Sequence, residues 1–170
     1  MGDNGQGTDY SEYIGRPTAA AVVTVERAPV AAFAASVLDD KALWRNADAA
    51  AEAGFDGIPV PPTFFFSAAE SWCRHEEEQP EDPTGGDNPM AAVMGSLMAN
   101  GGLILHGEQA FEYHRDVVVG EKLTHRGVVK DIYEKPTGDR TMTFMVVENT
   151  YADESGEPVI TATMNVIHRS

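Results

Sequence analysis

Residues 61–75 read PPTFFFSAAESWCRH and form the most apolar helical stretch of the chain. The two prolines exclude a helix before them and favour a helix start directly after them. Phe64, Ala68 and Trp72 then recur every four residues, with further apolar residues beside them. A stripe of that breadth is typical of a helix that is buried on more than one side. The stretch therefore predicts a central helix inside the fold.

Strands are predicted to follow this helix. Residues 103–115, LILHGEQAFEYHR, alternate between apolar and polar after Leu105, which is the period of a strand. Three more β-rich runs follow at 122–133, 140–151 and 158–168, separated by turn residues. Long strands joined by tight turns form an antiparallel meander. The chain is therefore predicted to be an α+β domain in which a curved antiparallel sheet wraps round a long central helix.

Two shorter helices are predicted ahead of the central one. The first is expected to start after Thr24, which can serve as its N-cap, and to run to Ser36 through an Ala-rich sequence. The second is expected over Ala47–Ala53, because Asn46 is a good N-cap and Gly54 a good C-terminal stop.

The chain is predicted to hold one domain, over residues 13–170. Residues 1–12 are polar and Gly-rich, which predicts a disordered, solvated tail. Residues 79–102 hold several prolines and glycines, which predicts an irregular segment with a short Met-rich helix at 90–98. Irregular stretches of this length inside a compact domain are often functional, and this one is a possible lid.

The charge balance limits the partners. Lys and Arg number 12 and Asp and Glu number 27, so the formal net charge is −15 across 170 residues. Nucleic acid and anionic membranes both demand dense positive charge, so neither is an expected partner. The single cysteine, Cys73, cannot form an internal disulfide, and no signal peptide or membrane-length apolar run is evident. A cytoplasmic protein is expected.

Familiar cofactor and metal motifs are missing from the sequence, so no cofactor is expected. His106, Glu108 and His114 share one face of a regular strand, but same-face neighbours stand about 7 Å apart, too far to converge on one ion. These residues are read as a polar outer face, and no metal site is predicted. Cys73, beside Arg74, is read as a structural cysteine, because sequence neighbours on a helix point in different directions.

Glu70 stands in the middle of the apolar central helix. A carboxylate there must be paired, protonated or facing a cavity. Glu70 is therefore a candidate catalytic acid of the thioesterase type. The alternative is that it lies on the helix's most solvated edge.

Three short motifs carry a resemblance to a known family. They are Gly-Phe-x-Gly at 54–57, Phe-x-Tyr-His at 111–114 and Val-Gly-Glu-Lys-Leu at 119–123. Together and in this order they resemble the N-terminal MaoC-like dehydratase domain, a hot-dog fold, and the likeness extends from Tyr13 to Arg169. The sequence is most similar to the substrate-binding subunits of heterodimeric (3R)-hydroxyacyl-thioester dehydratases, including those of type II fatty-acid synthesis.

The resemblance also shows where catalytic groups are replaced. Catalytic members carry Asp-x-Asn-Pro-(Ile/Leu)-His, whose Asp and His activate the water that is added to, or removed from, an enoyl thioester. Asp39 matches the acid and Leu43 the apolar position, but Trp44 stands at the histidine position and the Asn-Pro pair is absent. An indole does not exchange protons at physiological pH.

A second catalytic element is also replaced. Catalytic members start the central helix with His-Gly, whose backbone N–H polarises the thioester carbonyl. Pro61 and Pro62 occupy the matching positions, and proline has no N–H. The N–H of Thr63 is a weak substitute.

The resemblance therefore implies a subunit that is inactive alone. It implies the non-catalytic, substrate-binding partner in an (R)-specific enoyl-CoA hydratase or 3-hydroxyacyl-thioester dehydratase, whose second hot-dog subunit brings the Asp and His. The ligand is expected to be an acyl-CoA or acyl-carrier-protein thioester. The residues expected to bind it are Trp44, Pro62, Thr63, Phe64, Phe65 and Trp72, although the aromatic residues can equally be core and dimer packing.

Two alternatives stay open. The first is a self-sufficient homodimer, either a hydratase that uses Asp39 and His106 or a thioesterase that uses Glu70. The second is a protein that binds an acyl ligand without transforming it. Because the carriers are anionic and the chain is acidic, either the partner subunit or a local basic cluster must meet their phosphates. The basic candidates are Arg16, Lys122, Arg126 and Arg169.

Overall fold

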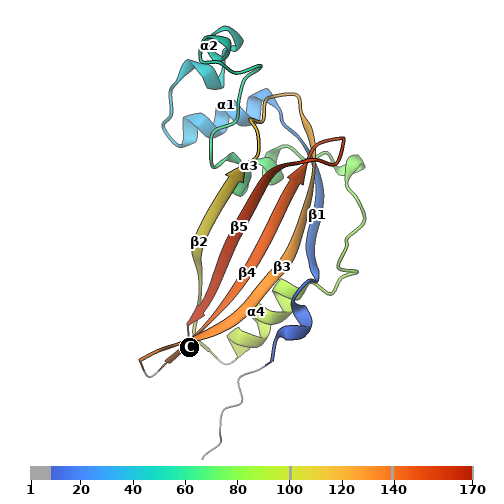
Figure 1. Cartoon of the computed structure of the whole chain (residues 1–170), viewed down its shortest axis with the longest axis vertical. Helices are drawn as coiled ribbons and strands as arrows, with labels where there is room; N and C mark the ends of the chain where they lie inside the picture. Colours follow the sequence, from blue (N-terminus) through green and yellow to red (C-terminus); the bar gives the residue numbers. More distant parts are fainter. Residues whose placement is uncertain (1–8, 100, 139, 170) are drawn as a thin grey trace, which may run out of the picture.

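The computed structural model describes residues 9–99, 101–138 and 140–169, and shows a five-stranded sheet with helices on one face (Figure 1). In chain order the elements are η1 (Ser11–Tyr13), β1 (Pro17–Thr24), α1 (Arg27–Ser36), η2 (Ala42–Trp44), α2 (Ala47–Glu52), α3 (Phe64–Trp72), η3 (Glu76–Glu78), α4 (Pro89–Ala99), β2 (Leu103–Tyr113), β3 (Lys122–Thr137), β4 (Arg140–Ala152) and β5 (Pro158–Arg169).

The sheet confirms the predicted α+β fold. Its strand order is β1-β3-β4-β5-β2, and every neighbouring pair is antiparallel. β3, β4 and β5 form the expected meander, while β2 lies outside β5 and β1 pairs with β3. β2 has a paired neighbour on one side only, so its outer edge is open in the described chain.

Two hydrophobic clusters lie on the same face of the sheet, here called the inner face. The first cluster packs α1 and α3 against one end of the strands, with Phe64 fully buried between Phe33 and Phe65 at ring distances of 5.7 and 5.6 Å. The second packs α4, through Val93 and Leu97, against the other end. The predicted central helix is α3, and it is nine residues long. The inner face is therefore covered by α1 and α3 at one end and by α4 at the other (Figure 1).

The two helices that precede α3 match their predictions unequally. α2 begins where expected, because the Asn46 side chain accepts a hydrogen bond from the N–H of Ala49 at 3.0 Å. α1 begins at Arg27, later than predicted, because β1 continues to Thr24. Its N-cap is Glu26, in an extended conformation and without a side-chain cap, so the prediction of Thr24 as N-cap is wrong.

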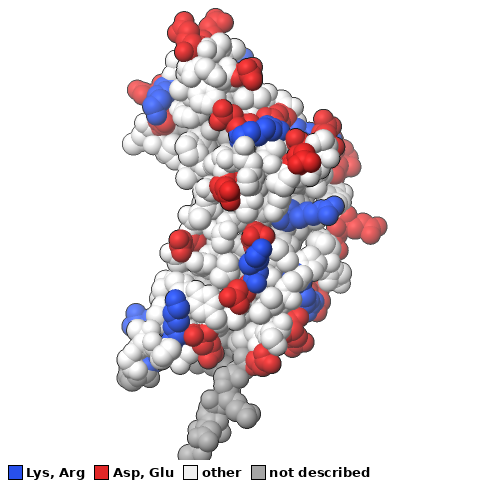
Figure 2. All heavy atoms as spheres, in the orientation of Figure 1, with Lys and Arg blue, Asp and Glu red and all other residues white. Residues whose placement is uncertain are grey.

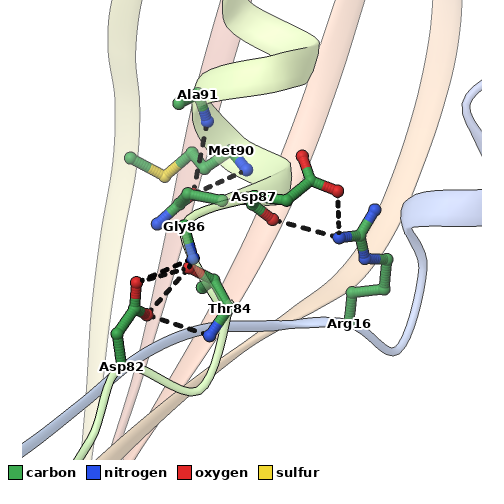
Figure 3. Close-up of polar contacts among 8 residues, drawn as sticks. Arg16, Asp82, Thr84, Gly86, Asp87, Met90 and Ala91 are labelled. Atoms are coloured by element: carbon green, nitrogen blue, oxygen red, sulfur yellow. Dashed lines mark hydrogen bonds and ion pairs between the residues drawn. The ribbon is translucent and has the colours of Figure 1, made fainter.

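The Met-rich helix predicted at 90–98 within the segment 79–102 is confirmed as α4, Pro89–Ala99. The loop before α4 is held by several polar contacts (Figure 3). Asp82 accepts hydrogen bonds from Thr84 and Gly86, and Arg16 pairs with Asp87 at 2.8 Å. These contacts tie the loop to the start of β1, and its role as a lid stays a prediction.

The tail predicted over residues 1–12 includes a residue that is packed in the structure. Residues 1–8 lie outside the described residues, but Tyr10 is buried against the α4 cluster and its hydroxyl lies 3.2 Å from Oγ of Ser96. The packed chain therefore begins before residue 13.

The surface reflects the acidic composition. Asp and Glu side chains are spread over the face shown in Figure 2, several of them close to a Lys or Arg. Within the described ranges, no helix has the length and apolar character that crossing a bilayer requires.

Candidate functional site

A row of small side chains, here called the small-residue row, crosses the inner face between the two hydrophobic clusters. Gly127 of β3 pairs with Asn149 of β4, which pairs with Ala162 of β5. A Cβ at Gly127 would lie only 2.8 Å from Oδ1 of Asn149, so the glycine leaves room for the asparagine side chain. A cavity of about 190 Å³, the inner-face cavity, lies at this row and is lined by residues of α3 and four of the five strands.

A polar cluster lines this cavity. Oε1 of Glu70, on α3, lies 2.5 Å from Nδ1 of His125 on β3, and accepts a hydrogen bond from the Tyr151 hydroxyl at 3.1 Å. Nε2 of His125 lies 2.9 Å from Oδ1 of Asn149, and its ring stacks on Tyr151 at 4.7 Å. Oε2 of Glu70 lies 3.8 Å from Nη1 of Arg74. Glu70 is thus both paired and facing a cavity.

The surroundings of Glu70 keep it ionised. Burial raises the pKa of its carboxyl, but the contacts with His125, Tyr151 and Arg74 outweigh burial and hold the pKa below its usual value. Burial, together with the Glu70 charge, raises the pKa of Tyr151, which remains a hydrogen-bond donor.

Both ring nitrogens of His125 already face oxygen atoms, and the residue is only 4% exposed. A general base needs a free nitrogen within hydrogen-bond reach of its substrate. The cluster therefore presents the carboxylate of Glu70 at the cavity, with His125 engaged on both ring nitrogens.

His125 and Asn149 were not predicted from the sequence. The available signal was the alternation of β3, in which Leu123, His125 and Val129 occupy one face and the first and last are apolar. That alternation places a histidine inside the fold. It does not say that Glu70, 55 positions earlier, lies against it.

His106 lies on the opposite face from the one predicted. A β-bulge interrupts β2 between His106 and Glu108, so that His106 opposes Val166 and Glu108 opposes the next residue, Asn165. His106 therefore faces inward, against the ring of Phe66 at 5.1 Å, while Glu108 faces outward. The predicted shared face is wrong, because Gly107 inserts an extra residue.

In the described parts of the chain, no group of three potential metal ligands gathers.

A second cavity, the Trp44 cavity, lies beside the loop before α3. Its volume is about 290 Å³, and its lining is mostly apolar, including Trp44, Phe55 and Pro62. The Tyr113 hydroxyl lines it as well and donates to the Pro62 carbonyl at 2.6 Å, and burial raises the pKa of Tyr113 to about 12. The structure thus brings together two residues, Trp44 and Pro62, that are 18 positions apart in the sequence.

Asp39 lies outside both cavities. Asp39 is the last residue of the Schellman turn that ends α1. In this turn the N–H of Leu38 donates to the Ala35 carbonyl and the N–H of Asp39 donates to the Ala34 carbonyl. Its carboxylate pairs with Nζ of Lys41 at 2.9 Å. Lys41, and next the indole of Trp44, lower the pKa of Asp39. The predicted pairing of Asp39 with His106 has no contact to support it, since His106 packs on Phe66.

The sequence comparisons agree with this architecture. Residues 12–162 match the family described as "FAS1-like, dehydratase domain region". The chain belongs to this family. A UPF0336 protein of Saccharopolyspora erythraea is 29% identical over 160 residues, covering 92% of this chain and 89% of the relative. A UPF0336 protein of Parafrankia is 27% identical over 159 residues, covering 93% of both chains.

Several solved structures with the hot-dog fold are similar to this chain. The ChsH1-ChsH2 complex from Mycobacterium tuberculosis matches with a TM-score of 0.70 and 17% identity, over 89% of this chain and 83% of that chain. The HadBC (3R-hydroxyacyl-ACP dehydratase) complex of the same organism matches with a TM-score of 0.62 and 21% identity, over 94% and 98%. The (R)-hydratase of A. caviae matches with a TM-score of 0.55 and 18% identity, over 95% and 97%. The hot-dog prediction is confirmed.

The remaining predicted binding residues of this family member lie in different surroundings. Phe65 lines the inner-face cavity, whereas Phe64 is fully buried in the core and lines neither cavity, which matches the alternative interpretation of the aromatic residues as core. Thr63 is the N-cap of α3. Trp72, at the other end of α3, is 49% exposed and lines neither cavity.

Proposed function

We propose that this chain is the substrate-binding, non-catalytic subunit of a two-chain enoyl-thioester hydratase, or 3-hydroxyacyl-thioester dehydratase. The observation that carries the proposal is the Trp44 cavity, which both Trp44 and Pro62 line. The MaoC-like resemblance matches these two positions to the catalytic histidine and to the His-Gly pair that binds the carbonyl. Their meeting at one cavity supports that correspondence.

The chemistry of hydration explains why this cavity is insufficient. Adding water to a trans-2-enoyl thioester puts hydroxyl on C3 and a proton on C2. A base must take one proton from water and an acid must return one to carbon near neutral pH. Trp44 can do neither, and Pro62 has no N–H for the carbonyl. A second hot-dog subunit with an Asp and a His supplies both groups.

This chain contributes a surface for the acyl group. The inner-face cavity includes Gln109 of edge strand β2 and Phe66 of α3, and Phe66 is 53% exposed. Leu103 and Leu105, also on β2, are 55% and 39% exposed. An open strand edge beside exposed apolar side chains fits a second subunit, and an acyl chain held by that subunit can enter the cavity from this side.

The named complexes support a two-chain assembly. ChsH1-ChsH2 and HadBC each pair two different chains, and HadBC is a 3R-hydroxyacyl-ACP dehydratase. The charge of this chain adds a further reason. Arg16 pairs with Asp87 and Lys122 with Glu78, so two of the four candidate phosphate contacts are already neutralised. The partner subunit is the better source of positive charge for an anionic carrier.

Co-expression tests the proposal. The chain is produced with a hot-dog subunit that carries the Asp and His, and hydration of crotonyl-CoA is measured on the purified complex. The complex should be active, and replacing the partner's catalytic histidine by alanine should lower turnover about 1,000-fold. Asp39→Asn in this chain should change turnover less than about twofold, because Asp39 is not the reacting acid. A loss on Asp39→Asn comparable with the loss from the partner variant would contradict the proposal.

A further inference from the structure

The inner-face cavity has a mixed lining that a plain acyl chain does not need. Phe65, Ala162 and Met164 give it apolar walls. Glu70 and Gln109 line it as well, one from α3 and one from β2. An alkyl segment beside an ionised carboxylate would remove water from it and return no hydrogen bond. The lining therefore indicates a ligand that is mainly apolar but carries a polar group.

Glu70 lines the cavity, and its second oxygen is the one with spare capacity to accept a hydrogen bond. Oε1 is occupied by His125 and Tyr151. Oε2 has Arg74 as its charged neighbour at 3.8 Å, which is longer than a hydrogen bond. A carboxylate oxygen accepts about two hydrogen bonds, so Oε2 has capacity for a donor.

Gln109 supplies the complementary group. Its side-chain amide carries both a donor and an acceptor, and it lines the same cavity from the edge strand. A hydroxyl matches this pair, because it donates one hydrogen bond and accepts another. The carboxylate is also rigidly placed, since His125 is itself held by Asn149 at 2.9 Å.

We propose that the inner-face cavity is a subsite for a hydroxyl group carried on the acyl chain, away from the carbons that react. The hydroxyl donates to Oε2 of Glu70 and accepts from the amide of Gln109, while the carbon chain lies against Phe65, Ala162 and Met164. This inference rests on the proposed function, because it names the class of acyl chain that the subunit selects.

Other ligand chemistries fit less well. A carboxylate at this point of the ligand would be repelled by Glu70. An ammonium would find the Glu70 charge already shared with His125 and Arg74. A ketone can accept from Gln109 but has no proton to give Glu70. The cavity volume of about 190 Å³ equals the space of about six waters, which admits a six-membered ring.

Small soluble probes test the subsite without any thioester. Cyclohexanol and cyclohexanone share a ring and an oxygen, but only the alcohol donates a hydrogen bond. Each is titrated into the full-length chain labelled with ¹³C at Ala and Met methyls, and binding is followed at Ala162 and Met164. Cyclohexanol should bind about tenfold more tightly than cyclohexanone, and cyclohexanecarboxylate should not bind.

Variants assign the effect to Glu70. Glu70→Gln should weaken cyclohexanol about tenfold and leave cyclohexanone nearly unchanged. Glu148→Gln, which removes a carboxylate paired with Lys130 outside the cavity, is the matched control and should leave both affinities unchanged. Equal binding of alcohol and ketone to the unaltered chain would overturn the proposal, even if Glu70→Gln fails to fold. So would methyl shifts that leave out Ala162 and Met164.

The probe experiment is separate from the test of the proposed function. It uses no partner subunit and no enoyl thioester. If the alcohol and ketone bind equally while the co-expressed complex hydrates crotonyl-CoA, the subsite is wrong and the function stands. If the alcohol is preferred while the complex is inactive, the function is wrong and the chain keeps a site for hydroxyl ligands.

Discussion

Glu70 is a carboxylate in an otherwise apolar helix, and residues of two strands hold it in place. His125 and Tyr151 follow it in the sequence by 55 and 81 positions, and both contact its Oε1. These contacts and Arg74 outweigh the effect of burial, so the pKa of the carboxyl lies below its usual value.

The lowered pKa of Glu70 predicts a pH-dependent loss on substitution. Glu70→Gln should lower the free energy of unfolding by about 2 kcal/mol at pH 7, because a half-buried charged hydrogen-bond acceptor is removed. A carboxyl whose pKa is lower in the folded chain stabilises the fold above its unfolded pKa of about 4.3, and loses that effect as pH falls through the folded value. The difference from wild type should therefore shrink below about pH 4 in urea titrations.

Glu148→Gln is the control for that measurement, because Glu148 forms a more exposed pair with Lys130. Its effect should stay within about 0.5 kcal/mol at pH 7. A Glu70→Gln difference that stays constant from pH 7 to pH 3 would show that the carboxylate charge plays no part.

Leu38 offers a second test at this scale. Its φ is +60°, which is the left-handed conformation that favours glycine, and its side chain is 91% exposed. Leu38→Gly should therefore raise the free energy of unfolding by about 1 kcal/mol, since strain is removed and no packing is lost. Urea midpoints measure this. Val37→Gly, at an ordinary φ of −94°, should give no stabilisation.

Among the elements, the predicted strands are present, but the face assigned to His106 in β2 was wrong because one residue changed the register. The alternation of residues 103–115 predicted β2 well, but the bulge at Gly107 moved His106 to the inner face. A period-two pattern assumes that every residue advances the strand by one step. Gly107 is an extra residue in β2, and this is visible only in the pairing of β2 with β5. The bounds of the four later strands were predictable to within a few residues.

The small-residue row of Gly127, Asn149 and Ala162 makes a prediction about its glycine. Gly127→Ala should lower the free energy of unfolding by about 1 to 3 kcal/mol, because the new methyl would lie against Asn149 Oδ1 and Thr18 Oγ1. It should also change the ¹³C methyl chemical shift of Ala162, which belongs to the same row. Thermal or urea unfolding measures the stability, and ¹³C spectra report the local change.

Gly95→Ala is the matched control, because Gly95 is an exposed residue of α4 with open space at the Cβ position. It should raise the free energy of unfolding by about 0.5 to 1 kcal/mol. Equal effects of the two substitutions would argue against a packed row at Gly127.

For the whole molecule, the resemblance predicted the fold and the family, and the cavity arrangement extended it. Trp44 and Pro62 were singled out as separate departures from a catalytic pattern, and they line one cavity. The sequence could not show this meeting, because it depends on how the loop before α3 packs on β2. Under the proposed function, activity also requires a second subunit.

The open edge of β2 predicts where that subunit binds. Phe66→Lys should weaken assembly of the co-expressed complex about thirtyfold, because an exposed aromatic at the edge is replaced by a charge. Leu38→Lys, at an apolar residue in the turn after α1 that is more exposed still, is the control and should leave assembly unchanged. Native mass spectrometry of the two complexes measures the effect. Equal assembly of both variants would place the interface elsewhere.

Under the proposed function, this chain lacks its own groups for moving protons to and from an enoyl thioester. This is measured by the rate at which the purified chain, free of any partner, adds water to crotonyl-CoA. That rate should be no higher than the rate in buffer. Turnover in the range of about 1 to 1,000 per second, as typical enzymes show, would contradict the proposed function.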